Sequence, residues 1–261
     1  MKEIHLNRVE HSYKAGDEPP VMPPSFEGDA MFYEDGERIG FYLEKMPESM
    51  QPFVDVADYE LNSKRVPKTV MVRANGLNKP DLMVKQESCI IGSVPRNTRM
   101  RRMHHNRSSV HRSKAAQTFI KAMVIAGRQS LSVIKELTPE LYETHRESVL
   151  DRVPEQWRFC DLFTSSISNA NIAAAVHRDN RNVIGALNVI VTRRVNATGG
   201  NLYLPEYDVT LPSAHNSLTV YPAWRNYHGV TPIEPTHPGG YRNSLIWYAL
   251  DTFKDDFDDA E

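Results

Sequence analysis

The sequence predicts an α+β fold in which helices pack against a jelly-roll or barrel of short strands. Two segments in the middle of the chain, residues 113–135 and 139–152, have the apolar periodicity of helices. From Trp157 onward the chain changes to many short β-rich runs, which are separated by glycine, proline and asparagine. Strands this short and this numerous are typical of jelly-rolls and barrels.

Residues 1–90 are expected to form an N-terminal elaboration of this core. Residues 17–29 (DEPPVMPPSFEGD) are rich in proline and acidic side chains, which indicates an extended connector on the surface. The following run, MFYEDGERIGFYL, predicts a hairpin whose turn is Asp35-Gly36. A short helix is expected within residues 47–62. We find no residues with recognisable chemistry before residue 85.

The core itself is expected to span residues 91–250 and to begin with a basic segment and the two helices. Thr138 and Pro139 predict the start of the second helix, because an N-cap hydroxyl followed by proline at the first helical position is a common start signal. The strand candidates that follow are RFCDLFTSSIS, NIAAAV, GALNVIVTRR, NLYLP, NSLTVY and NSLIWYAL. Residues 251–261 form an acidic tail.

Composition favours a globular protein that stays in the cytoplasm. The 261 residues are enough for one sizeable core. No apolar run approaches the roughly 20 residues that span a bilayer, and the start MKEIHLNRVEHSYK lacks the apolar core of a signal peptide. We therefore expect no membrane partner. Cys89 and Cys160 have neither the spacing of a disulfide framework nor that of a zinc site, which indicates a reducing compartment.

Three residues predict a metal site. In VHRD, one residue separates His177 from Asp179, and the two side chains converge because side chains alternate between the faces of an extended segment. A third ligand, His228, lies in the distant run YPAWRNYHGV. Two histidines and one carboxylate are the ligand set of non-haem iron(II), and they leave open positions for a cosubstrate and dioxygen. His177, Asp179 and His228 are therefore the predicted metal-binding and catalytic residues.

A 2-oxo acid cosubstrate is expected beside this iron(II). Its oxidative decarboxylation by dioxygen supplies an oxidant that can attack an unactivated C–H bond. Arg242 offers a planar, two-pronged donor for the distal carboxylate of 2-oxoglutarate. Ser244, two residues further on, lies on the same face of the predicted strand and can donate its hydroxyl. A structural ion pair is the alternative role of Arg242.

Each of these residues also has a purely structural interpretation. An HxD triplet is common by chance, and a histidine on a strand is more often packed or hydrogen-bonded than bound to a metal. The ordered combination favours the metal site, since the HxD triplet is followed in turn by Gly199-Gly200, by His228 and by Arg242-x-Ser244.

A basic segment precedes the helices. Residues 95–114, which include Arg101 and Arg102, contain seven lysines and arginines, three histidines and no acidic residue. A solvated surface is the simplest interpretation. The functional alternative is a phosphate-contacting patch, because each cation that neutralises a phosphate releases counterions and adds affinity. The acidic tail is expected to be solvated, and screening of this basic segment is its alternative role.

Residues 158–250 resemble the TET/JBP family of 2-oxoglutarate and iron(II)-dependent nucleic-acid base dioxygenases, above all its phage and bacterial members. The similarity follows the runs FTSSISNANIAAAVHRDN, VIGALNVIV, GGNLYLPEY, HGVTPI and YRNSLIWYAL in order, with weaker similarity in IIGSVPRNTRMRR. The HxD, histidine and arginine pattern recurs across the wider superfamily, whereas FTS, N-x-N, GGxLxLPEY and HGVTPI are narrower. The cysteine-rich, zinc-binding segment of the animal members has no counterpart here, so DNA contacts have to come from another element.

The resemblance implies a double-stranded β-helix of the cupin type, buttressed by helices, and hydroxylation of the 5-methyl group of a pyrimidine in DNA. A duplex hides that methyl group, so the base has to leave the stack. Arg101 and Arg102 would then hold the phosphates beside the flipped nucleotide. The resemblance also implies that Asn182, three residues after the metal aspartate, faces the base. Asn171 is expected to bind the oxo acid, with a turn cap as its alternative.

Asn182 favours 5-methylcytosine as the substrate, with 5-hydroxymethylcytosine as the product. Cytosine presents an acceptor at N3 and thymine a donor, so an amide donor at residue 182 favours cytosine. An amide can also accept, and asparagine often only forms a turn. The alternatives are a thymine hydroxylase, an oxygenase that acts on a protein side chain or a small molecule, and a nucleic-acid-binding protein with a vestigial core.

Overall fold

Two stacked sheets form the centre of the protein in this computed structural model, which describes residues 1–63, 65–70 and 86–253. The larger sheet runs in the order β1-β2-β3-β13-β9-β16-β7-β5-β4, with β6 paired to β5, and the smaller one in the order β12-β11-β14-β8. In the larger sheet β1 and β2 are parallel, and the other described pairs of that sheet are antiparallel. A separate pair is formed by β10 and β15. The fold is the predicted α+β jelly-roll.

The strands are short, as the sequence predicts. The larger sheet contains β1 (Lys2–His5), β2 (Ala30–Glu34), β3 (Glu37–Leu43), β4 (Thr69–Val70), β5 (Glu87–Val94), β6 (Asn106–Arg107), β7 (Ser165–Ala170), β9 (Asn188–Val195), β13 (Leu218–Tyr221) and β16 (Tyr241–Tyr248). The smaller sheet contains β8 (Ala174–His177), β11 (Leu202–Leu204), β12 (Val209–Leu211) and β14 (His228–Val230). The remaining pair is β10 (Ala197–Gly199) and β15 (Ile233–Pro235).

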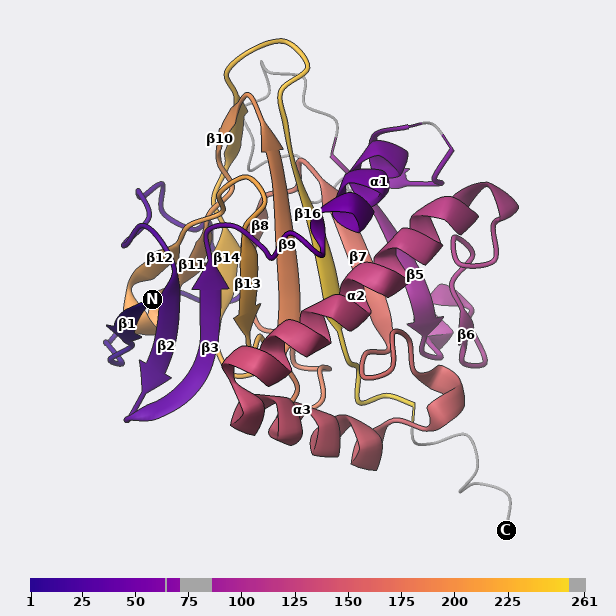
Figure 1. Cartoon of the computed structure of the whole chain (residues 1–261), viewed down its shortest axis with the longest axis horizontal. Helices are drawn as coiled ribbons and strands as arrows, with labels where there is room; N and C mark the ends of the chain where they lie inside the picture. The colour runs from indigo at the N-terminus through magenta and orange to yellow at the C-terminus, as the bar shows by residue number, and fades with distance from the viewer. Residues whose placement is uncertain (64, 71–85, 254–261) are drawn as a thin grey trace.

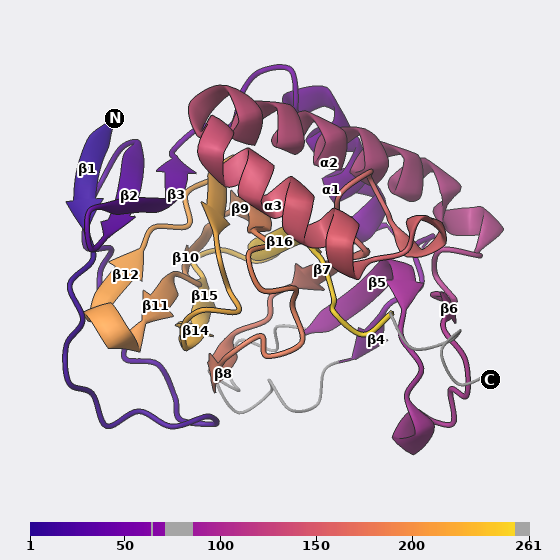
Figure 2. The same cartoon turned by 90° about the horizontal axis from the view of Figure 1, so that it is seen from below.

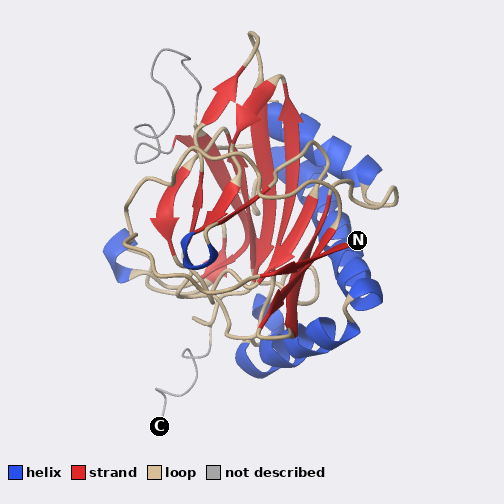
Figure 3. Cartoon of the chain, turned by 90° about the vertical axis from the view of Figure 1, so that its left-hand side faces the viewer, coloured by secondary structure: helices blue, strands red, loops and turns tan. Residues whose placement is uncertain are grey.

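In the described part of the chain, three α-helices cover one face of the larger sheet. They are α1 (Gln51–Asn62), α2 (Gln117–Leu137) and α3 (Pro139–Arg152), and Figure 1 shows α2 crossing the strands diagonally. Seen from below, the helices lie on one side of the larger sheet and the smaller sheet lies on the other (Figure 2). The side view in Figure 3 shows the same layers. Side chains from both sheets line a cavity on this side, away from the helices.

Strand β16 divides these two interiors, because its side chains alternate between the faces of the sheet. Leu245 and Trp247 belong to the apolar core under the helices, and the Trp247 Nε1–H donates to the carbonyl of Met123 on α2 at 3.1 Å. Arg242 and Ser244 point to the opposite face, between the two sheets. The same alternation on β7 and β9 gives the inter-sheet space its mixture of polar and apolar side chains.

The predicted N-terminal hairpin is confirmed and forms part of the larger sheet. Its turn residues Asp35 and Gly36 have φ values of 53° and 82°, the left-handed conformation that two-residue hairpin turns need. Strand β3 of the hairpin pairs with β13, so the first residues of the chain extend the core sheet. The boundary expected after residue 90 falls inside β5. The short helix expected within residues 47–62 is α1.

The boundary between α2 and α3 corrects one detail of the sequence interpretation. Helix α3 begins at Pro139 as predicted, but its N-terminus has no side-chain cap. The Thr138 hydroxyl instead donates to the carbonyl of Ile134 at 3.0 Å, in the last turn of α2. The hydroxyl therefore binds the carbonyl end of the preceding helix, where the proline leaves no continuing backbone donor.

Both cysteines are free and buried. Among the described helices, none has the length and apolar content that crossing a bilayer requires. The acidic tail begins at Asp251, and its residues 254–261 lie outside the described part of the chain.

Candidate metal centre and cosubstrate pocket

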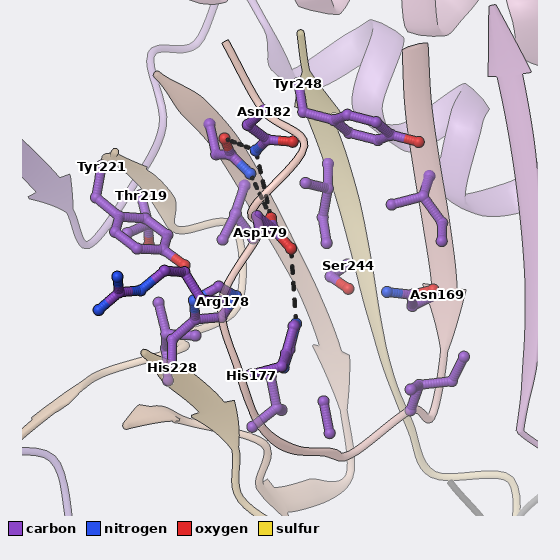
Figure 4. Close-up of a pocket in the computed structure, with 18 of the residues that line it drawn as sticks. Asn169, His177, Arg178, Asp179, Asn182, Thr219, Tyr221, His228, Ser244 and Tyr248 are labelled. Carbon is purple, nitrogen blue, oxygen red and sulfur yellow. Dashed lines mark hydrogen bonds and ion pairs between the residues drawn. The ribbon is translucent and has the colours of Figure 1, made fainter. Parts of the chain in front are cut away.

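The three predicted metal ligands converge at the edge of the smaller sheet. His177 is the last residue of β8 and lies directly opposite His228, the first residue of β14. Their ring centroids are 4.3 Å apart, and Asp179 Oδ1 is 3.8 Å from His177 Nε2. Figure 4 shows the three side chains facing one another. One ligand atom from each residue lies within 4.8 Å of the other two, which is the geometry of a group that holds one metal ion.

Both imidazoles are oriented for metal binding by their other ring nitrogen. His177 Nδ1 lies 2.8 Å from the carbonyl of Ala175, and His228 Nδ1 lies 3.2 Å from the carbonyl of Asn226. A carbonyl only accepts, so each Nδ1 carries the proton and each Nε2 keeps its lone pair for a metal. Burial, together with the neighbouring His177, lowers the pKa of His228 to about 4, which keeps that imidazole neutral. The donor set therefore fits a divalent transition metal.

Two asparagines hold the carboxylate ligand. Asp179 Oδ2 accepts from Asn188 Nδ2 at 3.2 Å and from Asn182 Nδ2 at 3.4 Å, and Asn182 Nδ2 also donates to Asn188 Oδ1 at 2.8 Å. A carboxylate cannot donate, so these bonds fix both amide orientations. The Asn182 donor that was expected to read cytosine is therefore engaged with Asp179 and Asn188. What Asn182 has left for a ligand is its oxygen, which Figure 4 shows directed away from Asp179.

The triad opens into a cavity of about 560 Å³ between the two sheets. That volume is enough for a cosubstrate and a further small group. Its walls combine apolar side chains with tyrosines and convergent polar groups: Ile167, Ile172, Ile190, Ile246, Val230, Tyr221, Tyr248, Asn169, Thr219, Arg242 and Ser244. Ser244 and Arg242 project from the same face of β16, as predicted from their spacing.

Arg242 is buried in this cavity. It is 4% exposed, its Nε has no hydrogen-bond partner among the described residues, and its Nη2 donates to Ser213 Oγ at 3.5 Å. Burial, together with the like charge of Arg194, lowers the pKa of Arg242 to about 9. Among the described residues no ion pair involves Arg242, which argues against the structural alternative. An unpaired buried guanidinium has the chemistry to bind an anion.

Arg194 adds a second positive charge that the sequence interpretation missed. It lies directly opposite Arg242 in the β9–β16 pair, and its guanidinium donates to the carbonyl of Gly199. Burial lowers the pKa of Arg194 as well. In the described part of the chain, neither arginine has a carboxylate within ion-pair distance. The sequence alone does not show that Arg194 lies opposite Arg242, because this depends on the register in which β9 and β16 pair.

The Gly199-Gly200 turn packs against both arginines. Gly200 has a φ of 66°, and a Cβ on it would lie 3.2 Å from Cδ and Nε of Arg242. Gly199 supplies the carbonyl that binds Arg194. The turn therefore provides the space in which the Arg242 side chain lies, which explains why glycine stands there.

Gly200→Ala is expected to weaken 2-oxoglutarate binding by roughly tenfold, because the added Cβ would displace the Arg242 guanidinium. A tenfold loss corresponds to about 1.4 kcal/mol of binding free energy. Gly239→Ala is the matched control, because Gly239 has a similar φ of 78° and no atom within 4 Å of its Cβ position. Both variants are expected to lose about 1–2 kcal/mol of stability to the left-handed conformation. Titration with 2-oxoglutarate, followed by thermal shift, separates the two effects. Equal affinities in both variants would contradict the role of Gly200.

Asn171 occupies the turn position that was the alternative to binding the oxo acid. Asn171 follows the end of β7 with a φ of 56°, and it exchanges hydrogen bonds with the backbone of Arg242, through Oδ1 at 2.9 Å and through its N–H at 2.8 Å. It thus acts as a turn residue that fixes the start of β16. Asn169, two residues earlier, lines the cavity instead.

The basic segment lies apart from the cavity lining, and part of it is structural. Arg101 is exposed, and Arg102 donates from Nη1 to the carbonyl of Pro95 at 2.7 Å. Arg107 binds the carbonyls of Gln156 and Arg158, at 2.9 Å and at 3.2–3.3 Å, so its charge serves the fold. The cations at the cavity are different ones, Arg178 and Arg181, which flank the metal carboxylate in sequence.

The fold is a double-stranded β-helix with a His-Asp-His group at one edge, and it was compared with solved structures. NgTET1 in complex with 5mC DNA has a TM-score of 0.58 at 14% sequence identity, covering 87% of this chain and 78% of that chain. An oxidoreductase of the 2OG-Fe(II) oxygenase family from Burkholderia pseudomallei has a TM-score of 0.43 at 10% identity, covering 81% and 84%. A bsmA homolog from Methylobium petroleophilum PM1 has a TM-score of 0.41 at 12% identity, covering 87% and 90%. At 14% identity, the similarity to NgTET1 is one of fold. The sequence itself matches none of the known protein families and none of the curated proteins with which it was compared.

Proposed function

We propose that the protein is a 2-oxoglutarate and iron(II)-dependent dioxygenase of the TET/JBP type, and that it hydroxylates the 5-methyl group of a pyrimidine in DNA. One observation carries the proposal. A single cavity contains the convergent ligands His177, Asp179 and His228 together with the unpaired guanidinium of Arg242. A metal site and an anion site in one enclosed space are what a reaction between a 2-oxo acid and dioxygen needs.

The residues divide the work of this reaction. His177, Asp179 and His228 would hold iron(II), and Arg242 and Ser244 would bind the distal carboxylate of 2-oxoglutarate. Activation of dioxygen is the chemistry that iron(II) held there would supply, so that one oxygen atom would enter a C–H bond of the methyl group and the other would appear in succinate as 2-oxoglutarate loses carbon dioxide. The apolar walls, such as Ile190 and Ile246, keep water away from the reacting groups.

Asn182 is the proposed contact to the base, through its oxygen rather than its amide donor. An acceptor there can bind the exocyclic amino group of cytosine, which supports 5-methylcytosine as the first substrate to test. The same oxygen can also accept from N3–H of thymine, so 5-methyluracil is the alternative base. Asn182 also donates to Asp179, so a base bound by Asn182 would lie next to the metal ligand.

Two features support DNA as the substrate class. The structurally similar NgTET1 was solved with 5mC DNA. In addition, cations occur both at the cavity, at Arg181, and on the basic segment that contains Arg101 and Arg102. Phosphates on either side of a flipped nucleotide would have partners at these arginines.

Mass spectrometry of nucleosides tests this proposal directly. The protein is incubated with iron(II), 2-oxoglutarate and DNA that contains 5-methylcytosine, and hydroxymethylcytosine and succinate are expected in equal amounts. The same digest reports hydroxymethyluracil if thymine is the substrate. If neither base is oxidised and no DNA-dependent succinate forms, the DNA substrate is wrong.

The double variant Arg101→Gln/Arg102→Gln is expected to raise the KM for DNA and to reduce the slope of log affinity against log salt by about two, because each lost phosphate contact removes close to one unit. The KM for 2-oxoglutarate should stay unchanged. Lys121→Gln/Arg146→Gln removes two exposed cations from the helical face and serves as the control. Activity and salt dependence equal to the parent protein would favour a protein side chain or a small molecule as the substrate.

A further inference from the structure

Glu206 is a buried carboxylate that connects the two segments that carry the metal ligands. It lies in the short 3-10 turn Pro205–Tyr207 after β11 and is 6% exposed. Its Oε1 accepts from Nη2 of Arg178 at 3.1 Å and from the backbone N–H of Tyr227 at 2.9 Å. Arg178 stands between His177 and Asp179, and Tyr227 directly precedes His228. A single oxygen therefore binds both segments of the triad.

The two segments also contact each other directly, through the same two residues that this carboxylate binds. The Arg178 guanidinium lies over the ring of Tyr227, with Cζ 4.6 Å from the ring centroid. A cation on an aromatic face is worth about 0.5–2 kcal/mol, and it restricts the position of the guanidinium that Glu206 binds. Carboxylate, guanidinium and ring thus form one contiguous unit, which we call the Glu206 clamp.

The neighbouring Tyr207 holds the same segment at a second point. Its hydroxyl donates to Asn226 Oδ1 at 3.1 Å, and the carbonyl of Asn226 in turn accepts from Nδ1 of His228. The turn Pro205–Tyr207 therefore fixes residues 226 and 227 through two side chains. This explains in physical terms why the sequence PEY stands at the end of β11.

The strand pairing at the metal site makes such a connection necessary. Strands β14 and β8 pair His228 with His177, but their register shifts between His228 and Val230. An irregularity of this kind interrupts the ladder of backbone hydrogen bonds. Backbone pairing alone leaves the separation of the two ligand segments less constrained at this point, and side-chain contacts have to supply the remaining constraint.

We propose that Glu206 is a positioning residue of the metal centre, whose carboxylate sets the separation between the His177–Asp179 segment and His228 by binding Arg178 and the Tyr227 N–H together. The inference rests on the metal site of the proposed function and is independent of the DNA substrate. Outer contacts of this kind contribute about tenfold to a hundredfold to metal affinity.

Titration of the full-length metal-free protein with cobalt(II), followed by visible absorption, tests the proposal without turnover. Glu206→Gln keeps an oxygen acceptor for Tyr227 but loses the charge that binds Arg178, and its cobalt(II) affinity is expected to fall by about tenfold to a hundredfold. The absorption bands are expected to change as well, because the ligand geometry changes. Glu60→Gln is the matched control, because Glu60 in α1 is 4% exposed and is also paired with an arginine, Arg65, at 3.3 Å. This substitution should leave cobalt(II) binding unchanged.

Arg178→Gln gives an independent test, since Arg178 is only half-buried and its substitution leaves the interior intact. It is expected to lose as much affinity as Glu206→Gln, and the double variant no more than either single one, because both act through one contact. Unchanged affinity and spectrum in the folded Arg178→Gln or Glu206→Gln protein would overturn the role of Glu206. Absence of cobalt(II) binding by the parent protein would instead overturn the metal site of the proposed function.

Discussion

His177→Ala is expected to abolish turnover while the protein stays folded. The imidazole supplies one of three ligands, and losing it should lower metal affinity by more than the roughly hundredfold effect of an outer contact. The side chain is 44% exposed, toward the cavity, so its removal leaves no void in the core. Succinate formation and metal content are the measurements, and circular dichroism reports the fold.

His237→Ala is the matched control for this variant. His237 lies in the exposed turn between β15 and β16, and its ring contacts only the hydroxyl of Thr236 among the described residues. Metal content and activity should equal those of the parent protein. A His177→Ala protein that keeps full metal content and activity would remove His177 from the ligand set and leave the triad unsupported.

Arg242→Met is expected to have two effects of opposite sign. It should raise the KM for 2-oxoglutarate by at least about thirtyfold, because a buried charge-assisted contact is worth about 2–5 kcal/mol. It should also raise the free energy of unfolding of the ligand-free protein by about 1 kcal/mol or more, since an unpaired buried cation is replaced by an apolar side chain of similar length. Denaturant unfolding with and without 2-oxoglutarate measures both effects.

The pH dependence of binding follows from the same residue. The folded pKa of Arg242, about 9, lies below the usual 12.5, so the unfolded chain binds more protons between these values and the stability of the ligand-free protein rises with pH there. An anion binds the charged form only. Affinity for 2-oxoglutarate should therefore fall as pH rises through about 9, and this inflection should be missing in Arg242→Met.

Arg193→Met provides the contrast for both measurements. Arg193 lies on the same sheet, next to Arg194, but it is paired with Asp55 at 2.9 Å and with Asp58 at 3.4 Å. Its loss should destabilise the protein and leave 2-oxoglutarate binding unchanged. If Arg242→Met behaves in the same way, Arg242 is a structural residue and the anion site is wrong.

The sequence was sufficient for those parts of the site that depend on local spacing. His177 and Asp179 converge, and Arg242 and Ser244 share a face, because the period of two along an extended segment does not depend on the rest of the fold. His228 was predicted from its order in the chain, and its position opposite His177 comes from the pairing of β14 with β8. The helices and short strands could be predicted for the same reason, since apolar periodicity is also a property of the local sequence.

Features that depend on tertiary contacts were not predictable in this way. The sequence leaves open whether Asn171 binds the oxo acid or forms a turn, because it does not show that β7 ends at Ala170, where the backbone turns into the left-handed conformation. The sequence also does not show that Asn188 lies beside Asn182, where it accepts from the amide that was expected to contact a base. Glu206 stands in an apolar run without any local sign of its partners, which arrive from two other segments.

Because Arg194 and Arg242 face each other, binding of the proposed cosubstrate is expected to stabilise the folded protein as well as to serve the reaction. Without an anion, the buried guanidinium of Arg242 and the half-buried one of Arg194 repel each other. A ligand at one hundred times its Kd adds about 2.7 kcal/mol to the stability of a folded protein. The lifetime of this protein against cellular proteases should therefore rise with the concentration of 2-oxoglutarate, so that its abundance follows the metabolic state of the cell.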